Sequence, residues 1–466
     1  QSADGGGTLK RVPIRGGNWN NAAITGVFAL NLNNPRSNAN VNIGARPASG
    51  DWQKAQAHAA GVQSTSQKDA PSAAGVATKP ASAGIFNRPA VPVVPRCTTV
   101  RTGRPSGFSL ASNSMAKTYN NLYEQVYDFE ALHAAYLRAR AGKRQNAEVQ
   151  RFEQDLEGNL IQLQNELIWG GYQTGSYRTF TIFEPKQRQV AALPFRDRVV
   201  QHALVAVLEP IWERRFIGDS YACRPGRGTH RGADRAQAML RQVKREHGQV
   251  YVLKADIAAY FRCIDHAILK MLVRRRVSCR RTLALFDAII DSAGPLHPDT
   301  PGVGLPIGNL TSQLSANIYL HELDEFVKHG LRERHYARYM DDFIVVHHDK
   351  QHLHRVRERI EIFLAQYLRL RTNNKTQVFP VHGFRGRALD FLGYRIWPTH
   401  RKLRRSSIRR ITQTLKRLQQ LYAARQVSLE RISQSVGSWL AHAGHANARG
   451  LVLAVLGRFK FSRSPA

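Results

Sequence analysis

Apolar residues in the middle of the chain follow helical spacing first and strand spacing afterwards. Helical spacing runs through 122–136 and again through 152–167, so two helices are predicted on either side of the basic segment 138–144. Between 178 and 193 the period changes to alternation around a turn, which predicts a β-hairpin. Helical spacing returns from Arg196 to about residue 215 and predicts a long helix.

Two later apolar strands carry acidic residues at their ends. The run 249–256 has a buried-strand pattern and ends in Asp256, and 336–346 is an apolar hairpin with Asp341 and Asp342 at its tip. Moving an unpaired carboxylate out of water is costly, so buried strands seldom hold one. Three acids at the ends of two such strands therefore predict a bound cation.

This arrangement of acids suits nucleotidyl transfer, which uses two divalent ions to activate a 3′-hydroxyl and to hold a triphosphate. Mg²⁺ prefers carboxylate oxygens and keeps several waters, so two or three aspartates suffice. Adjacent side chains at a hairpin tip point to opposite sides of the chain. We expect Asp256 and Asp341 to ligate two Mg²⁺ ions, with Asp342 in support and dNTPs as substrates. The alternative is an exposed turn with incidental acids.

The first part of the chain has a different composition. Nine asparagines lie between Asn18 and Asn42, and Ala, Ser, Pro and Gly dominate 49–110. A segment with so few large apolar residues cannot offset chain entropy by burial, so 49–110 is predicted to be a disordered linker. The predicted domains are an Asn-rich fragment at 1–48, this linker, a mixed α/β region at 111–395 and a basic helical region at 396–466.

Charge points to a polyanionic partner. Lys and Arg total 68 against 34 acidic residues, giving a net charge of +34 and a pI of about 10.7. Nucleic acid is the leading partner because phosphate neutralisation supplies most non-specific affinity, with an anionic membrane surface as the alternative. The stretch 401–425 holds nine Lys or Arg and no acid, at helical spacing. It predicts a helix that meets duplex phosphates, or else a solvated charged face.

Neither the apolar runs nor the cysteines predict a membrane span or a zinc site. No run of about 18 apolar residues is present, so a transmembrane helix is not expected. The four cysteines lie far apart without a C-x-x-C pair, which favours free thiols in a reducing, cytoplasmic compartment over zinc ligands.

The tip Tyr339-Met340-Asp341-Asp342 resembles the YxDD motif of reverse transcriptases. Other blocks resemble further family segments in the same order, over about Ser112 to Gly457. They are Gln187–Arg198 (fingers), Ser220–His230 (the R-P-G block of bacterial members), Asp256–Phe261 (first palm motif), Leu368–Lys375 (lysine motif), Leu389–Tyr394 (primer grip) and Ser435–Ala443 (end of the thumb).

The resemblance implies an RNA-directed DNA polymerase with a right-handed fingers–palm–thumb fold, mixed α/β in the palm and helical at both ends. Arg188 would hold the triphosphate, since a guanidinium suits bidentate phosphate contact. Phe261 would clash with a ribose 2′-hydroxyl, and Lys375 would assist the pyrophosphate leaving group. Further nucleotide contacts are expected from Ile307, Gly308 and Gln313, and template or primer contacts from Arg196, Arg224, Arg227, Gly393, Arg404, Arg405 and Arg409.

One segment indicates a subfamily. Most reverse transcriptases carry Q-G-x-x-x-S-P where this chain has Ile307-Gly308 through Ser312-Gln313. This variant resembles the enzymes of diversity-generating retroelements, which copy a template-repeat RNA into cDNA, misincorporate opposite adenines and work with a basic accessory variability determinant protein. Isoleucine cannot offer a glutamine's amide hydrogen bonds, so discrimination should weaken by an amount on the order of 1–3 kcal/mol. The alternative is that Ile307 and Gln313 are neutral packing variants.

The Asn-rich N-terminus resembles the end of the C-type lectin fold that many such retroelements diversify. Asparagine codons are adenine-rich, so we hypothesise that residues from about 10 to 48 are a translated template repeat; the alternative is an ordinary Asn-rich tail. For the whole protein, the competing interpretations are a group II intron- or retron-type reverse transcriptase, and a non-catalytic RNA-binding protein with a polymerase fold.

Overall fold

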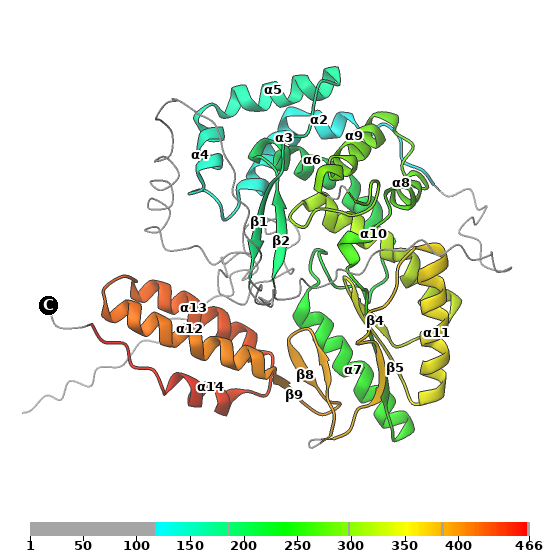
Figure 1. The fold of residues 1–466 in the computed structure, drawn as a ribbon, viewed down its shortest axis with the longest axis vertical. Coiled ribbons are helices and arrows are strands. Elements are labelled where there is room, and N and C mark those ends of the chain that lie inside the picture. The colour runs from blue at the N-terminus through cyan, green and yellow to red at the C-terminus, as the bar shows by residue number, and fades with distance from the viewer. Residues whose placement is uncertain (1–116, 184–186, 297–298, 384–385, 464–466) are drawn as a thin grey trace, which may run out of the picture. The chain divides into compact units, whose positions relative to one another are not determined.

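A computed structural model describes residues 117–183, 187–296, 299–383 and 386–463. The chain divides into two units, and all described residues belong to the larger, which includes Ser109–Ala466. The predicted fragment 1–48 and linker 49–110 lie outside the described residues. The described part mixes helices with three separate antiparallel sheets, so the predicted α/β class is confirmed (Figure 1).

The first helices are shorter than predicted because an aspartate divides each predicted helix. Asp128 leaves helical geometry, and its side chain accepts the amide of Ala131 at 2.9 Å to begin a new helix. Asp155 does the same for Gly158 at 3.1 Å. The resulting helices are α2 (Glu124–Tyr127), α3 (Phe129–Arg140), α4 (Ala147–Gln154) and α5 (Leu156–Trp169).

The predicted hairpin and long helix are confirmed. β1 (Arg178–Ile182) pairs antiparallel with β2 (Arg188–Ala192), with Arg178 opposite Ala192. α6 (Phe195–Glu213) follows, and α3 packs along it. Most of α6 is buried although Pro210 lies inside it, because neighbouring helices surround it on several sides.

The central sheet has the strand order β4-β5-β3-β6, with every pair antiparallel. α7 (Thr229–His247) packs on β4 and β5, and α11 (Lys350–Tyr367) packs on β3, β5 and β6, so the sheet lies between these helices (Figure 1). Its strands form the buried core beneath the acids. They are β3 (Tyr251–Asp256), β4 (Tyr336–Tyr339), β5 (Asp342–His347) and β6 (Gln377–Pro380).

Between β3 and β4 the chain forms a helical layer. The short η2 (Tyr260–Arg262) is followed by α8 (His266–Arg274), α9 (Arg280–Asp291) and η3 (Gly294–Leu296). α10 (Leu310–Glu325) then passes through the interior against α6 and α8, and continues into the π-helical η4 (Phe326–Gly330).

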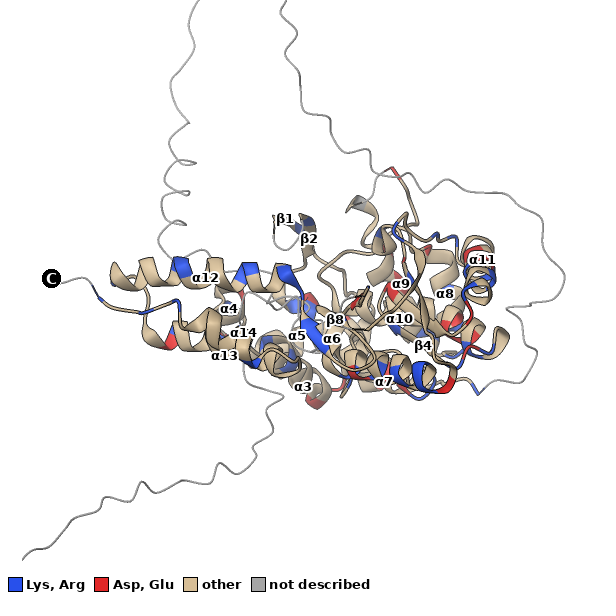
Figure 2. Cartoon of the chain, turned by 90° about the horizontal axis from the view of Figure 1, so that it is seen from below, with Lys and Arg blue, Asp and Glu red and all other residues tan. Residues whose placement is uncertain are grey.

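The C-terminal part contains a small sheet and three helices. Blue Lys and Arg positions run along α12 without a red acidic position (Figure 2). This agrees with the basic helix predicted from 401–425. The elements are β7 (Leu389–Phe391), β8 (Tyr394–Ile396), β9 (Arg401–Leu403), α12 (Arg405–Ala423), α13 (Leu429–Gly444) and α14 (Arg449–Leu456).

Two expectations from the sequence concern membrane-spanning helices and free cysteines. Among the described residues, no helix is both long enough and apolar enough to cross a membrane. Cys223 and Cys279 are free, buried thiols. Cys263 is disulfide-bonded, so the expectation of free thiols is wrong at this position.

Candidate active site

Strand pairing brings the three predicted acids to one end of the central sheet. Asp256, the last residue of β3, pairs with Asp342, the first residue of β5. Paired residues of antiparallel strands point to the same face, so these two carboxylates share a face. Asp341 directly precedes β5, and its carbonyl accepts the amide of Ile257 at 3.2 Å. The site is therefore built where two neighbouring strands end.

The turn that presents Asp341 is tight and strained. Tyr339 pairs with Asp342, so only Met340 and Asp341 lie in the turn. Met340 has a φ of +56°, a left-handed conformation that costs a non-glycine residue energy. The Nη1 group of Arg338 donates to the Met340 carbonyl at 3.0 Å and holds the turn from below.

Arg338 is itself held by a fully buried ion pair that sequence reasoning missed. Its Nε and Nη2 groups donate to Asp324 Oδ1 and Oδ2 at 2.7 and 2.6 Å, and both side chains are 0% exposed. Tyr336 also donates to Asp324 Oδ1 at 2.7 Å. Asp324 lies on α10, so this helix supports the acidic hairpin from inside the core. The available signal was an arginine inside an otherwise apolar strand.

The carboxylates have perturbed acidity. Burial raises the pKa of Asp341 to about 7, and the nearby Asp256 carboxylate raises it as well. Burial raises the pKa of Asp342 to about 6, opposed by the ammonium of Lys254, whose Nζ lies 3.6 Å from Asp342 Oδ2. Asp342 Oδ1 is buried and accepts no hydrogen bond. The site thus holds more negative charge than its protein surroundings neutralise.

This excess charge fits a divalent cation, which would stabilise the ionised forms of Asp256 and Asp341. In the part of the chain that the structure describes, no three His, Cys, Asp or Glu side chains form a ready-made metal cluster. Mg²⁺ is commonly held by one or two carboxylates together with water and substrate phosphates, and the carboxylates of Asp256 and Asp341 are of that kind.

Asn373, which sequence reasoning also missed, fixes Asp256. Its amide Nδ2 donates to Asp256 Oδ2, and its backbone amide donates to the Asp256 carbonyl at 2.7 Å. The backbone amide of Lys375 donates to Asn373 Oδ1 at 2.8 Å, which ties this exposed lysine to the loop beside the acids. Arg188 begins β2, and its positive charge opposes the rise in the pKa of Asp341. Both cations predicted to contact phosphates thus belong to the surroundings of the acids.

Ile307 and Gly308, two further predicted nucleotide contacts, lie on a segment that docks against β2. The backbone amide of Ala191 donates to the Ile307 carbonyl at 3.0 Å. Gly308 has a φ of +136°, and a Cβ there would lie 2.4 Å from the Ala191 carbonyl oxygen. Only glycine fits this close approach without a backbone shift. Ile307 itself is half-buried.

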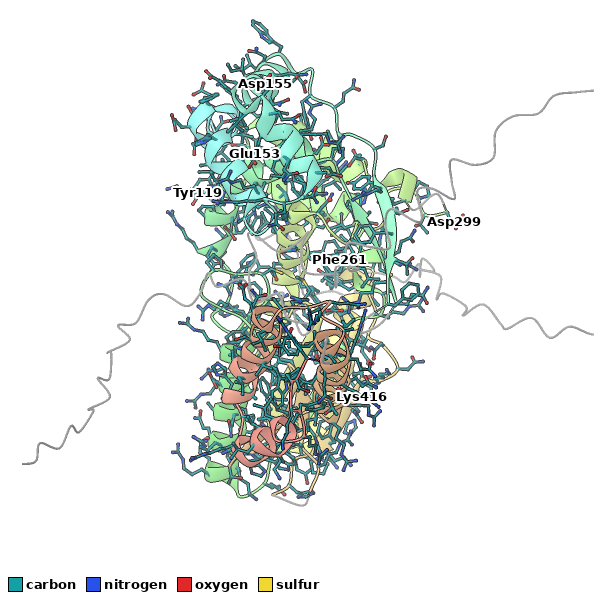
Figure 3. The ribbon with its side chains drawn as sticks, turned by 90° about the vertical axis from the view of Figure 1, so that its left-hand side faces the viewer. Tyr119, Glu153, Asp155, Phe261, Asp299 and Lys416 are labelled. Carbon is teal, nitrogen blue, oxygen red and sulfur yellow. The ribbon has the colours of Figure 1, made fainter. Side chains whose placement is uncertain are left out.

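Phe261 and Gln313 flank this segment. Phe261 lies in η2 and is half-buried (Figure 3), and its carbonyl accepts the amide of Leu305 at 2.7 Å. Gln313 lies in the first turns of α10, and its Oε1 is buried without a hydrogen-bond partner. Leaving such an acceptor buried and unpaired costs free energy.

The residues predicted to bind template or primer differ in how exposed their side chains are. Arg224 is 3% exposed and donates within the protein, to Glu213 Oε2 at 3.0 Å and to the carbonyls of Ile217 and Ser220 at 2.6 and 2.8 Å. The prediction is therefore wrong for Arg224 in this structure, because its guanidinium holds the R-P-G loop instead. The loop motif alone could not distinguish the two roles.

The remaining predicted contacts are distributed over several elements. Arg196 pairs with Glu166, and the half-buried Arg227 follows the loop that Arg224 holds. Arg404 bonds to Asp390, and its charge opposes the rise in the pKa of Asp342, so it belongs near the acids. Arg405 and Arg409 are exposed on α12. Gly393 forms the β7–β8 turn with a φ of +90°.

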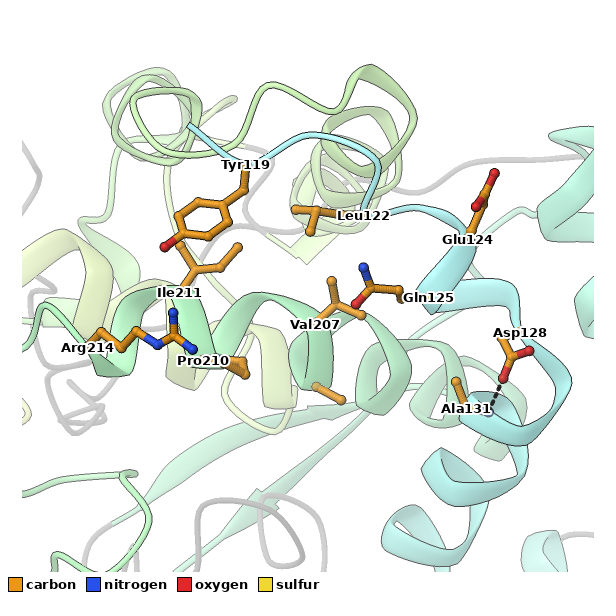
Figure 4. Close-up of a pocket in the computed structure, with 11 residues that line it drawn as sticks. Tyr119, Leu122, Glu124, Gln125, Asp128, Ala131, Val207, Pro210, Ile211 and Arg214 are labelled. Carbon is orange, nitrogen blue, oxygen red and sulfur yellow. Dashed lines mark hydrogen bonds between the residues drawn. The ribbon is translucent and has the colours of Figure 1, made fainter. Parts of the chain in front are cut away.

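A groove of about 750 Å³ lies elsewhere, between α2, the start of α3 and α6. Its floor includes Leu122, Val207 and Ile211, with Glu124 and Arg214 at its margins (Figure 4). None of the three aspartates lines it. The candidate chemistry is therefore at the sheet end and not in this groove.

Known proteins similar to this chain indicate its family. Residues 183–396 match the family described as reverse transcriptase (RNA-dependent DNA polymerase). Protein YkfC of Escherichia coli is 30% identical over 277 residues, which cover 50% of this chain and 70% of YkfC. The group II intron-encoded protein LtrA of Lactococcus lactis is 34% identical over 146 residues, covering 30% of this chain and 23% of LtrA. The match thus spans less than a quarter of the intron-encoded relative.

Among solved structures, apo telomerase from Candida tropicalis has a TM-score of 0.40 at 13% identity, covering 64% of each chain. The family match includes all three aspartates, and the similarity to YkfC extends over most of that protein. The chain therefore belongs to the reverse transcriptase family, the RNA-dependent DNA polymerases.

Proposed function

We propose that this protein is the reverse transcriptase of a diversity-generating retroelement, which copies a template-repeat RNA into cDNA with misincorporation opposite adenines. One observation carries the proposal: Ile307-Gly308 through Ser312-Gln313 replaces the Q-G-x-x-x-S-P that most reverse transcriptases carry. The RNA-directed DNA polymerase activity follows from the family. The mutagenic role is proposed in addition to that activity.

In this proposal the central sheet is the palm, the β1–β2 hairpin with the preceding helices forms the fingers, and α12–α14 form the thumb. Asp256 and Asp341 hold two Mg²⁺ ions, with Asp342 in support. When bound, the ions activate the primer 3′-hydroxyl and neutralise the triphosphate. Arg188 and Lys375 bind the phosphates of the incoming dNTP.

Phe261 is proposed to exclude the ribose 2′-hydroxyl of a ribonucleotide, so that the product is DNA. The half-buried ring already packs against the core and against Tyr260, with ring centroids 5.6 Å apart. A ring fixed in this way cannot easily retreat from an added hydroxyl, which is the property a steric gate needs.

The structure offers a physical route to infidelity at Ile307. The main chain of this residue is fixed by Ala191, so its side chain belongs to the same docked segment as Gly308. Glutamine at this position could hydrogen-bond to the nucleotide or the template, whereas isoleucine cannot. Losing polar positioning weakens discrimination by about ten- to two-hundred-fold, corresponding to roughly 1–3 kcal/mol.

The proposed partners are a template RNA, the RNA–cDNA duplex and a basic accessory variability determinant protein. The exposed Arg405 and Arg409 of α12 are proposed to grip the duplex backbone. Residues from about 10 to 48 are proposed to be translated template repeat. Sequencing the surrounding locus tests this idea, which requires a near-copy that differs mainly at adenines.

A second candidate is a group II intron-type reverse transcriptase. The similarity to LtrA and to the nuclear intron maturases of Arabidopsis thaliana favours it. The Ile307 and Gln313 substitutions favour the retroelement instead. The two candidates predict different accuracy for the same polymerase.

Primer extension on an adenine-containing RNA template, with Mg²⁺ and dNTPs, distinguishes them once the cDNA is sequenced. The cognate RNA and accessory protein should be supplied where the locus encodes them. Errors clustered opposite adenine support the retroelement, and faithful cDNA supports the intron type. Asp341→Asn is the inactive control. No cDNA from the wild type with both partners present would indicate a non-catalytic RNA-binding protein.

The variant Ile307→Gln tests the proposed cause of the errors. We expect errors opposite adenine to fall about tenfold or more, because the amide restores polar positioning. Ile307→Val keeps the apolar character and should leave the error spectrum unchanged. Equal error spectra in Ile307→Gln and the wild type would rule out Ile307 as the cause, while leaving the polymerase activity intact.

A further inference from the structure

A directed chain of hydrogen bonds joins the start of the β1–β2 hairpin to the segment that carries Ile307. Asn309 Nδ2 donates to the Tyr177 hydroxyl at 2.8 Å. The Tyr177 hydroxyl lies 3.0 Å from Ser292 Oγ, and Ser292 Oγ donates to the Ile289 carbonyl at 2.7 Å. Because the only proton of Ser292 Oγ is used there, Tyr177 is the donor to Ser292. The donor and the acceptor are therefore defined for each of these hydrogen bonds.

Asn309 does not cap the helix that it precedes. It is the residue before α10, where an asparagine side chain usually caps the helix, but it makes no capping hydrogen bond. Gln201 of α6 takes that role, since its Oε1 accepts the amide of Leu310 at 3.1 Å. Asn309 is only 4% exposed. Its side chain therefore serves a contact between elements instead of its own helix.

This contact fixes the hairpin from a second point. Tyr177 directly precedes β1, and Asn309 follows Gly308 by one residue. The other strand, β2, is held by the bond from Ala191 to the Ile307 carbonyl. Both strands are thus anchored on the same short segment, 307–309. Strand pairing then transmits the position to Arg188, which lies opposite Ile182.

We infer that Tyr177 and Asn309 are positioning residues that set where Arg188 meets the triphosphate of the incoming dNTP. The inference rests on the proposed phosphate-binding role of Arg188. Neither side chain needs to touch the nucleotide. Their effect reaches the substrate through the hairpin, so losing them weakens dNTP binding more than it slows the chemical step at the acids.

The test is steady-state primer extension with Tyr177→Phe, Arg188→Ala and the double variant. Tyr177→Phe removes the hydroxyl and both of its hydrogen bonds, and should raise KM for dNTP about five- to tenfold with a smaller change in kcat. In the Arg188→Ala background, Tyr177→Phe should have no further effect on kcat/KM, because both changes act through the same group. Asn309→Leu can neither donate to Tyr177 nor accept from it and should reproduce the KM effect.

Tyr123→Phe is the matched control. Its hydroxyl donates to the Leu167 carbonyl at 2.8 Å in the buried interior, away from the hairpin contacts. This variant loses a buried hydrogen bond of the same kind and should leave KM for dNTP unchanged. Thermal melting of each variant checks that it is folded.

Two results separate the inference from the proposal beneath it. If Arg188→Ala leaves KM for dNTP at the wild-type value, the proposed role of Arg188 is wrong and the inference fails with it. If Arg188→Ala raises KM but Tyr177→Phe lowers kcat/KM equally in both backgrounds, Arg188 keeps its role and the positioning inference alone is overturned. A KM shift in Tyr123→Phe equal to that in Tyr177→Phe would also overturn it.

Discussion

Arg338 and Asp324 place two opposite charges beneath the turn that carries Asp341, where neither side chain reaches solvent. Attraction within a buried ion pair offsets much of the desolvation that its burial costs, whereas loss of one partner leaves an uncompensated buried charge. The same arginine also holds the Met340 carbonyl. Arg338 therefore contributes both to the stability of the fold and to the geometry of the turn.

The variant Arg338→Met should lower the free energy of unfolding by about 3–5 kcal/mol, because it leaves the Asp324 carboxylate buried and unpaired. The double variant Arg338→Met/Asp324→Leu should recover most of the loss. Urea denaturation measures both. Arg355→Ala removes an arginine whose side chain is 66% exposed, and should change the free energy of unfolding by less than about 0.5 kcal/mol. Equal stability of the single and double variants would contradict this account.

Gly308 and Gly302 allow strain and close approach to be separated. Both have positive φ, +136° and +74°, but a Cβ at position 302 meets nothing within 4 Å, whereas at 308 it collides with the Ala191 carbonyl. Gly302→Ala should cost about 1 kcal/mol of stability from backbone strain alone. Gly308→Ala should cost more and also lower kcat/KM for dNTP, since β2 must shift. Chemical denaturation and primer extension measure the two effects.

Among the elements, the sequence predicted those whose pattern is local. Alternation predicted the hairpin of β1 and β2, and apolar runs ending in acids predicted the end of the central sheet. Helical spacing continues across Asp128 and Asp155, so the two helix breaks could not be read from apolar period alone. They arise because an aspartate side chain competes for backbone amides.

The supporting side chains of the site were less predictable than its acids. Asp256 and Asp341 were found because their chemistry is unusual in apolar strands. Asn373 acts through a partner 117 residues away and Arg338 through one 14 residues away, whereas Arg224 turns inward to partners only 4 to 11 residues away. Such choices depend on which polar groups the fold brings within hydrogen-bond distance, and a single sequence does not contain that information in local form.

A cluster of histidines joins α7, β8 and α13. The Tyr394 hydroxyl lies 2.9 Å from His230 Nδ1 and 3.0 Å from His442 Nδ1. The rings of His230 and His445 stack with centroids 3.8 Å apart. Burial, together with the nearby histidines, lowers the pKa of His230 and of His442 to about 4. The contact therefore requires neutral imidazoles.

This requirement predicts a pH dependence of α13 docking. Free histidine titrates near 6.5, so between about pH 6.5 and pH 4 separated helices bind protons that the docked cluster excludes. Docking stability is complete above that range and falls as pH decreases through it. Charges facing the cluster modify but do not reverse the sign: Asp234 raises the pKa of His230, Arg401 lowers it, and Arg404 lowers that of His442.

Hydrogen exchange measures this effect. Amides of α13 should exchange faster at pH 5 than at pH 7 after correction for intrinsic rates, while those of α5, which carries no histidine, should not change in this way. His442→Gln removes one of the two imidazole partners of Tyr394, leaves the backbone carbonyl that accepts from the same hydroxyl, and should reduce the pH dependence. Identical corrected protection of α13 at both pH values would contradict the prediction.

For the whole molecule, the net charge of +34 makes binding to polyanions strongly dependent on salt. The double variant Arg405→Gln/Arg409→Gln should weaken binding to an RNA–DNA duplex equally for all sequences. It should also reduce the slope of log affinity against log salt by about one for each phosphate that is no longer neutralised. Fluorescence anisotropy across a salt series measures the slope. Arg355→Gln/Arg359→Gln removes the same charge from α11 and should leave the slope nearly unchanged.

The bond from Ala191 to the Ile307 carbonyl is made by main-chain atoms only. Main-chain docking does not depend on which side chain position 307 carries, whereas Gly308 beside it cannot change without a collision. Position 307 therefore tolerates substitution in the folded structure, whereas position 308 does not. Under the proposed role of Ile307, substitution at this position changes copying accuracy with little penalty in folding, so faithful and error-prone enzymes of this architecture are expected to be close neighbours in sequence space.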